Sequence, residues 1–110
     1  MILENVFYLY DLLNEIHHPI SDGMIIGRKS GELTFPNDNK LSGEHVRFTL
    51  KSNNIIITDL NSKNATIINY NVKIRNKSYK LKENDQIEVG NQKFLIKKSK
   101  DGTNLKVTSF

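Results

Sequence analysis

The 110-residue sequence contains no cysteine and no tryptophan, and it has only two prolines. Without cysteine, neither disulfides nor thiolate metal sites can form. Long apolar runs are also missing, and none approaches the roughly 20 residues that a membrane-spanning helix needs. Residues 1–5 carry no basic side chain, and Asp11 and Glu15 interrupt the apolar stretch that follows, so this start does not resemble a signal peptide. We therefore expect an intracellular protein without a membrane partner, located in the cytoplasm (or the nucleus, in a eukaryote).

The length and the charge restrict the domain number and the type of partner. A chain of 110 residues corresponds to one domain, and a chain of this size buries enough surface to fold without disulfide bonds. The formal net charge is +4. A mildly basic domain favours anionic partners. Charge alone does not separate a phosphorylated peptide from a nucleic acid.

Short apolar or alternating segments separated by polar turns run through most of the chain. Residues 46–51 alternate strictly between apolar and polar side chains, which is typical of a half-buried strand. Pro19 donates no backbone hydrogen bond, so residues 16–20 should form an edge strand. A helix over residues 9–16 is an alternative from spacing. We expect an all-β sandwich with strands at residues 6–13, 16–20, 24–28, 33–35, 46–51, 55–59, 66–69, 72–74, 79–81, 86–89 and 93–97.

Polar clusters lie at the ends of several predicted strands. They provide a guanidinium, a hydroxyl, a carboxamide and exposed backbone amides, which are groups that suit a phosphate ester. Arginine fits phosphate because its planar fork matches two oxygens. The clusters are Gly27-Arg28, then Ser42-Gly43-Glu44-His45, then Asp59-Leu60-Asn61-Ser62-Lys63-Asn64-Ala65-Thr66, and finally Asn69.

These clusters resemble the forkhead-associated (FHA) domain family of phosphothreonine-peptide readers. The family pattern is Gly-Arg, then Ser-x-x-His, then Asp-x-x-Ser-x-Asn-Gly-Thr, and an Asn three residues on. The later family signature, Asp-x-Ile-x-x-Gly, is matched within residues 84–90. The resemblance implies an all-β sandwich of two twisted antiparallel sheets with recognition loops at one end. It assigns residues 1–98 to the FHA domain and leaves residues 99–110 as a C-terminal extension, an extra strand or a mobile tail.

The resemblance also implies roles for individual residues. Arg28 and the Ser42 hydroxyl would hold the phosphate, and Asn64 would hold the peptide backbone through its donor and its acceptor. His45 would fix the Ser42 loop through its ring. The residues expected to bind the phosphopeptide are Arg28, Lys40, Ser42, Gly43, Lys63 and Asn64, and those expected to support the site are Gly27, His45, Thr66 and Asn69.

Ala65 and Gly43 depart from the family pattern, and the turn after Asn69 also lacks its common glycine. Ala65 stands where the family has glycine, and its β-carbon disfavours positive φ, so we expect that turn to differ slightly. Gly43 replaces a side chain that is often long and polar in relatives, which removes one group from the phosphate rim. Lys40, two residues before Ser42, can compensate or read an acidic residue further along the peptide.

The resulting hypothesis is a non-enzymatic module, without cofactor or metal, that binds a phosphothreonine-containing protein segment, alone or fused to another domain. Ser42 and His45 are not a catalytic pair, since no nucleophile elbow or third member accompanies them. His17 and His18 lack a third metal ligand. A scaffold FHA domain that binds its partner without phosphate is the first alternative. A basic β-domain that binds nucleic acid comes after it.

Overall fold

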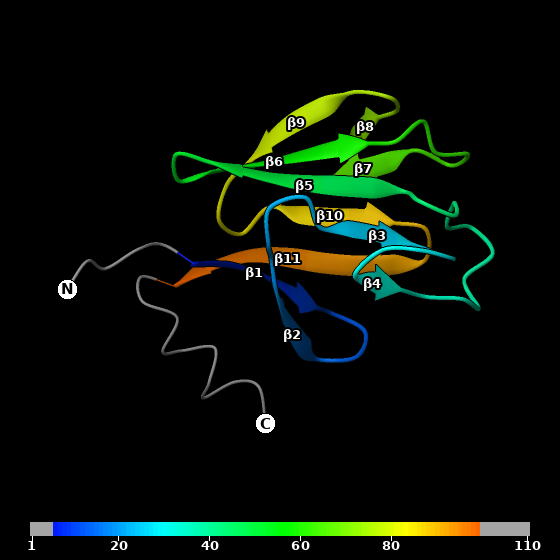
Figure 1. The fold of residues 1–110 in the computed structure, drawn as a ribbon, viewed down its shortest axis with the longest axis horizontal. Helices are drawn as coiled ribbons and strands as arrows, with labels where there is room; N and C mark the ends of the chain where they lie inside the picture. Colours follow the sequence, from blue (N-terminus) through cyan, green and yellow to red (C-terminus); the bar gives the residue numbers. More distant parts are fainter. Residues whose placement is uncertain (1–5, 100–110) are drawn as a thin grey trace.

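The computed structural model describes residues 6–99, which form two packed β-sheets (Figure 1). One sheet has six strands in the order β2-β1-β11-β10-β7-β8, and the other has five in the order β4-β3-β5-β6-β9. The strands are β1 (Val6–Asp11), β2 (Ile16–Pro19), β3 (Ile25–Gly27), β4 (Leu33–Thr34), β5 (Val46–Lys51), β6 (Asn54–Asp59), β7 (Thr66–Ile68), β8 (Val72–Ile74), β9 (Ser78–Leu81), β10 (Gln86–Val89) and β11 (Gln92–Ser99).

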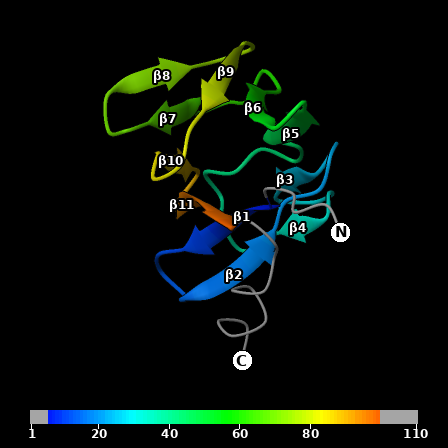
Figure 2. The ribbon, with the colours of Figure 1, turned by 90° about the vertical axis from the view of Figure 1, so that its left-hand side faces the viewer.

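The inward faces of the two sheets form one apolar core, and Figure 2 shows the sheets as two layers. Alternation along β6 places Ile55 and Ile57 inside, while Ile56 between them is half-buried. Phe48 from β5 and Phe94 from β11 are completely buried. Burial of this apolar surface is the main favourable contribution to folding. The all-β sandwich predicted from the sequence is confirmed, and no helix long and apolar enough to cross a membrane occurs within residues 6–99.

Residues 9–16, for which the sequence left a helix as an alternative, form the end of β1, a turn and the start of β2. The Asp11 carboxylate accepts hydrogen bonds from the backbone of Leu13 and Asn14, at 2.9 and 3.0 Å. Glu15 then adopts a positive φ of 57°. These features turn the chain into β2, so the helix over residues 9–16 is wrong. β2 is the edge strand that Pro19 predicted.

Two details of the sheets differ from the sequence prediction. β4 pairs with β3 in parallel, so the five-stranded sheet is mixed and not purely antiparallel. β11 continues through Ser99, whose partner on β1 is Val6, so it is longer than the strand predicted at residues 93–97. The rest of the predicted extension lies outside the described residues.

Several loops gather at one end of the sandwich, on the right-hand side of Figure 1. They follow β3, β4, β6 and β10, and the first three of them contain the polar clusters from Gly27 to Thr66. The β5–β6 turn lies at the opposite end. The sheets therefore bring sequence-distant clusters together on a common scaffold.

Candidate functional site

The end of β3 packs directly against the loop that carries Ser42. The Arg28 backbone amide donates to the Ser42 carbonyl oxygen at 2.9 Å. A β-carbon on Gly27 would overlap the carbonyl oxygen of Gly43. Gly27 is therefore required for the close approach of the two backbone segments, and this approach places Arg28 beside Ser42.

The Arg28 side chain is half-buried. Its Nε atom is buried and has no hydrogen-bond partner among the described residues. A buried donor without a partner is unfavourable and is uncommon in folded proteins. An anion bound at this end of the sandwich would provide the missing acceptor.

Ser42 connects two recognition loops and keeps a free donor. Its Oγ accepts the backbone N–H of Lys63 at 2.9 Å, so its hydroxyl hydrogen remains available. The Ser42 carbonyl faces the Arg28 amide, and in a trans peptide the following N–H points the opposite way. That N–H belongs to Gly43, and a β-carbon added to Gly43 would meet no other atom. Both groups can donate to an anion.

His45 connects the same two loops from the protein interior, and its ring is completely buried. Its Nδ1 accepts the Ser42 backbone N–H at 3.1 Å, so Nε2 carries the proton and donates to the Ala65 carbonyl oxygen at 2.8 Å. The ring thus contacts the backbone of Ser42 and not its hydroxyl. This geometry is that of a brace and does not form a catalytic dyad.

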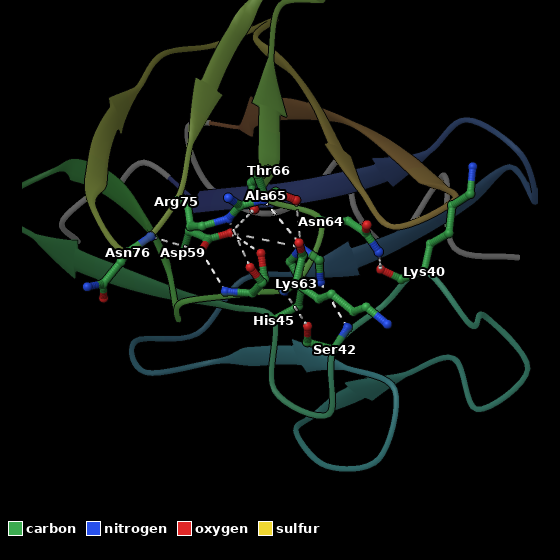
Figure 3. Close-up of polar contacts among 11 residues, drawn as sticks. Lys40, Ser42, His45, Asp59, Lys63, Asn64, Ala65, Thr66, Arg75 and Asn76 are labelled. Carbon is green, nitrogen blue, oxygen red and sulfur yellow. Dashed lines mark hydrogen bonds and ion pairs between the residues drawn. The ribbon is translucent and has the colours of Figure 1, made fainter.

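The loop after β6 is organised around the buried Asp59 carboxylate (Figure 3). Its Oδ1 accepts the backbone amides of Ser62 and Asn76, and its Oδ2 accepts the hydroxyls of Ser62 and Thr66 at 2.6 and 2.8 Å. Burial by itself raises the pKa of Asp59, but the donors from Ser62, Asn76 and Thr66 outweigh it and hold the pKa below its ordinary value. Thr66 therefore supports the loop and does not face a ligand.

Ala65 adopts a φ of 65°, the left-handed conformation that glycine favours. The alanine thus keeps this conformation, at a cost of about 1–2 kcal/mol. Its side chain is buried and its carbonyl is held by His45. The departure from glycine is tolerated because tertiary contacts fix the turn.

Asn64, Lys40 and Lys63 form the exposed rim of the site. The Asn64 carboxamide nitrogen donates to the Lys40 carbonyl oxygen at 2.9 Å. Part of the side chain that was predicted to hold the peptide backbone therefore already holds the neighbouring loop. One amide hydrogen and the carboxamide oxygen remain for a ligand. The Lys40 and Lys63 side chains are exposed and extend from the two loops in Figure 3.

A recess of about 220 Å³ lies beside this rim and is lined by Lys40, Asn64, Ala65, Ile67, Glu88, Gly90 and Asn91. Asp38 fixes its wall by accepting hydrogen bonds from the backbone of Lys40 and from Asn91 and Gln92. Burial raises the pKa of Asp38, and these donors lower it further than burial raises it, so the net pKa lies below the ordinary value. The sequence gives no signal for the bonds that join Asp38 to Asn91 and Gln92, because these two partners lie more than 50 positions away.

Asn69, the last residue of the motif, lies away from the phosphate-facing loops. Its carboxamide donates to Asp85 and accepts the Gln86 backbone N–H, both at 2.9 Å. Asn69 therefore braces β7 against β10. Arg75 was not singled out from the sequence, yet its guanidinium donates to the carbonyl oxygens of Ser62 and Lys63.

The site has donors for an anion. No group of three His, Asp or Glu side chains suitable for a metal occurs within residues 6–99. His17 and His18 are neighbours on β2, so their side chains point to opposite faces of the sheet. The arrangement can bind a phosphate group through Arg28, Ser42 and the Gly43 amide.

Similarity to known proteins agrees with this architecture. The FHA domain family profile matches residues 24–90, and no curated protein matches the chain. The N-terminal FHA domain of S. cerevisiae Rad53p, solved with a phosphothreonine peptide, is 20% identical with a TM-score of 0.75, and 86% of this chain aligns with 94% of that one.

Two bacterial structures are similar to the same extent. The FHA domain of Chlamydia trachomatis CT664 is 25% identical with a TM-score of 0.73 over 84% of this chain and 96% of that one. Mycobacterium tuberculosis EmbR, solved with a low-affinity phosphopeptide, is 23% identical with a TM-score of 0.77, over 84% of this chain and 24% of EmbR. Since the family profile covers more than half of the residues, the chain belongs to the FHA domain family.

Proposed function

We propose that this chain binds phosphothreonine in an extended segment of a partner protein. The observation that carries the proposal is the buried Nε atom of Arg28, which has no partner among the described residues and lies next to the Ser42 loop. A phosphate supplies close to two negative charges and three acceptor oxygens. It would therefore satisfy Arg28 and accept from Ser42 and Gly43 at the same time.

The remaining rim residues fit contacts beyond the phosphate. Asn64 has a carboxamide oxygen free to accept a peptide N–H, and it is fixed in place by its bond to Lys40. Lys40 and Lys63 add positive charge beside the phosphate without a fixed contact. Hydrogen bonds to charged groups contribute about 1.5–3 kcal/mol each, but ordering the peptide offsets much of this. The expected dissociation constant is on the order of micromolar.

Known FHA structures support the proposal. The Rad53p domain was solved with a phosphothreonine peptide, and EmbR was solved with a phosphopeptide. A module of this kind brings proteins together and needs no catalytic group, so we propose that the chain is not an enzyme and acts inside the cell. Residues 1–98 would be the binding unit, with residues 99–110 as an extension. The match to only a quarter of EmbR shows that this type of domain can be part of a longer chain.

The test is a calorimetric titration with one library-selected peptide in three forms: phosphothreonine, phosphoserine and unmodified. The unmodified form cannot make the phosphate contacts with Arg28 and Ser42. It should therefore bind at least about a hundredfold more weakly than the phosphothreonine form. Salt should weaken binding of the phosphorylated form, because the site lies at the surface and is partly screened.

The same series separates the other functions. A scaffold domain would bind the unmodified and phosphothreonine peptides equally well, and that result would replace the phosphate-reader proposal. A nucleic-acid binder would ignore the peptides and bind oligonucleotides with a steep dependence on salt. Tyr70 is the only strongly exposed aromatic residue within residues 6–99, which gives little surface for base stacking.

A further inference from the structure

Arg75 joins the recognition loop to the segment after β8. It is exposed, and its guanidinium uses two adjacent nitrogens to contact two consecutive backbone carbonyls. Nε donates to the Ser62 carbonyl oxygen at 3.1 Å, and Nη2 donates to the Lys63 carbonyl oxygen at 3.0 Å. In Figure 3, Arg75 and Ser42 lie on opposite sides of this loop.

These two contacts determine the direction of two backbone N–H groups. In a trans peptide the carbonyl and the next N–H point in opposite directions, and the described residues contain no cis peptide. The Ser62 carbonyl faces Arg75, so the Lys63 N–H points away from Arg75 and donates to Ser42 Oγ at 2.9 Å. The Lys63 carbonyl also faces Arg75, so the Asn64 N–H likewise points away from it. Within the described part of the chain, this Asn64 N–H has no hydrogen-bond partner.

We propose that Arg75 is a positioning residue for phosphate recognition. By holding the two carbonyls it keeps the Lys63 N–H on Ser42, which leaves the Ser42 hydroxyl to donate outward. It also keeps the Asn64 N–H directed to the same side, where it donates to a phosphate oxygen. This inference rests on the proposed function, but the amide orientation that it describes exists in the free protein.

The position of Arg75 is itself fixed by the protein. The next residue, Asn76, donates its backbone N–H to Asp59 Oδ1 at 3.0 Å, and the Asp59 N–H donates to the Lys77 carbonyl oxygen at 3.0 Å. Residues 75–77 are therefore tied to the base of the loop that Arg75 holds. Arginine is suited to this task because its planar fork reaches two acceptors at once, whereas lysine provides a single mobile ammonium.

The variants Arg75→Met and Arg75→Lys test this role, with Arg47→Met as the matched control. Arg47 is an exposed arginine on β5, outside the loops. Arg75→Met should weaken phosphothreonine-peptide binding by about tenfold, the effect of losing one or two oriented donors. Arg75→Lys, which keeps the charge, should remain severalfold weaker than the wild type at low and at physiological salt. Arg47→Met should change the affinity by less than about twofold.

Amide NMR spectra of the free variants provide a readout that does not depend on any peptide. In Arg75→Met the Lys63 and Asn64 amide signals should shift and the Lys63 amide should exchange faster with solvent, while the core strands keep their wild-type signals. Wild-type affinity in Arg75→Lys would show that only charge matters and would overturn the proposal, as would unchanged Lys63 and Asn64 amides in Arg75→Met. Failure of the proposed function is recognised separately, because the wild-type protein itself would then bind the phosphorylated and the unmodified peptide equally well.

Discussion

His45 donates a hydrogen bond from Nε2 to the carbonyl oxygen of Ala65, at 2.8 Å, across 20 positions of sequence. Both residues are buried, and the other ring nitrogen of His45 accepts the Ser42 backbone N–H. One neutral imidazole therefore fixes the relative position of the loops that follow β4 and β6. The geometry of the proposed phosphate site depends on a side chain that does not face the ligand.

Replacing His45 should lower both stability and affinity. His45→Ala leaves the Ala65 carbonyl and the Ser42 N–H without partners and opens a cavity in the interior. Each unsatisfied buried group costs about 1–3 kcal/mol, so we expect the free energy of unfolding to fall by about 2–4 kcal/mol. Denaturant unfolding of the variant and the wild type measures this difference, and a peptide titration measures the loss of binding.

His17→Ala is a suitable control for this experiment. His17 lies on the edge strand β2, where its ring is half-buried beside the rings of Tyr8 and Tyr10. Its removal should cost less stability than His45→Ala and leave the affinity unchanged. An unfolding midpoint of His45→Ala equal to that of the wild type would contradict the bracing role.

The turn between β7 and β8 holds a bulky residue in a left-handed backbone conformation. Asn69 and Tyr70 both have positive φ, at 50° and 73°, inside a turn closed by the Asn71 N–H and the Ile68 carbonyl. Asparagine accepts this conformation, but a bulky residue such as Tyr70 is strained there. Tyr70→Gly should therefore be more stable than Tyr70→Ala by about 1 kcal/mol.

Comparison of these two variants isolates the backbone effect, since both lose the Tyr70 hydroxyl contact with Gln86. Thermal unfolding gives the difference, and phosphopeptide affinity should be the same in both. A glycine variant no more stable than the alanine variant would mean that the turn carries no strain at this position.

Asp59 should make stability depend on pH in the acidic range. Its folded pKa is lowered, since the Ser62, Asn76 and Thr66 donors outweigh the effect of burial. The unfolded chain therefore binds a proton more readily than the folded protein, and stability rises with pH in this range. The contribution is fully present above about pH 4, the ordinary aspartate pKa, and is lost as the pH falls through the lower folded value.

Asp59→Asn removes this titration and the charged hydrogen bonds. The variant should be less stable than the wild type at neutral pH by about 2–3 kcal/mol, and this gap should narrow as the pH falls below 4. Denaturant unfolding at several pH values follows the gap, with the exposed Glu83→Gln as control. A gap that stays constant from neutral to acidic pH would show that the Asp59 charge does not stabilise the loop.

Much of the fold could be predicted because its signals are local. Alternation defined β5 at Val46–Lys51, and Pro19 indicated the edge strand. The parallel pairing of β4 with β3 has no such signal, because it depends on the path of the loop that connects these two strands. Arg75 and Asp38 could not be recognised for a related reason. Arg75 contacts only backbone carbonyls, which every residue has, and Asp38 meets donors far along the chain.

Arg28 gives the most direct test of the proposed site. In the free protein the Arg28 Nε has no acceptor. Arg28→Ala therefore removes a buried donor that makes no hydrogen bond. The free energy of unfolding should therefore change by less than about 1 kcal/mol. Phosphothreonine-peptide affinity should fall by about a hundredfold or more, since two charged hydrogen bonds of about 1.5–3 kcal/mol each are lost.

Arg28→Lys and Lys29→Ala complete the comparison. Lysine keeps the charge but loses the planar fork, so Arg28→Lys should bind with an affinity between those of the wild type and Arg28→Ala. Lys29 is exposed and adjacent in sequence, and Lys29→Ala should change the affinity by less than about threefold. Calorimetry on the four proteins decides the matter. If Arg28→Ala binds the phosphothreonine peptide as tightly as the wild type, the unpartnered guanidinium has another purpose and Arg28 is not part of the phosphate site.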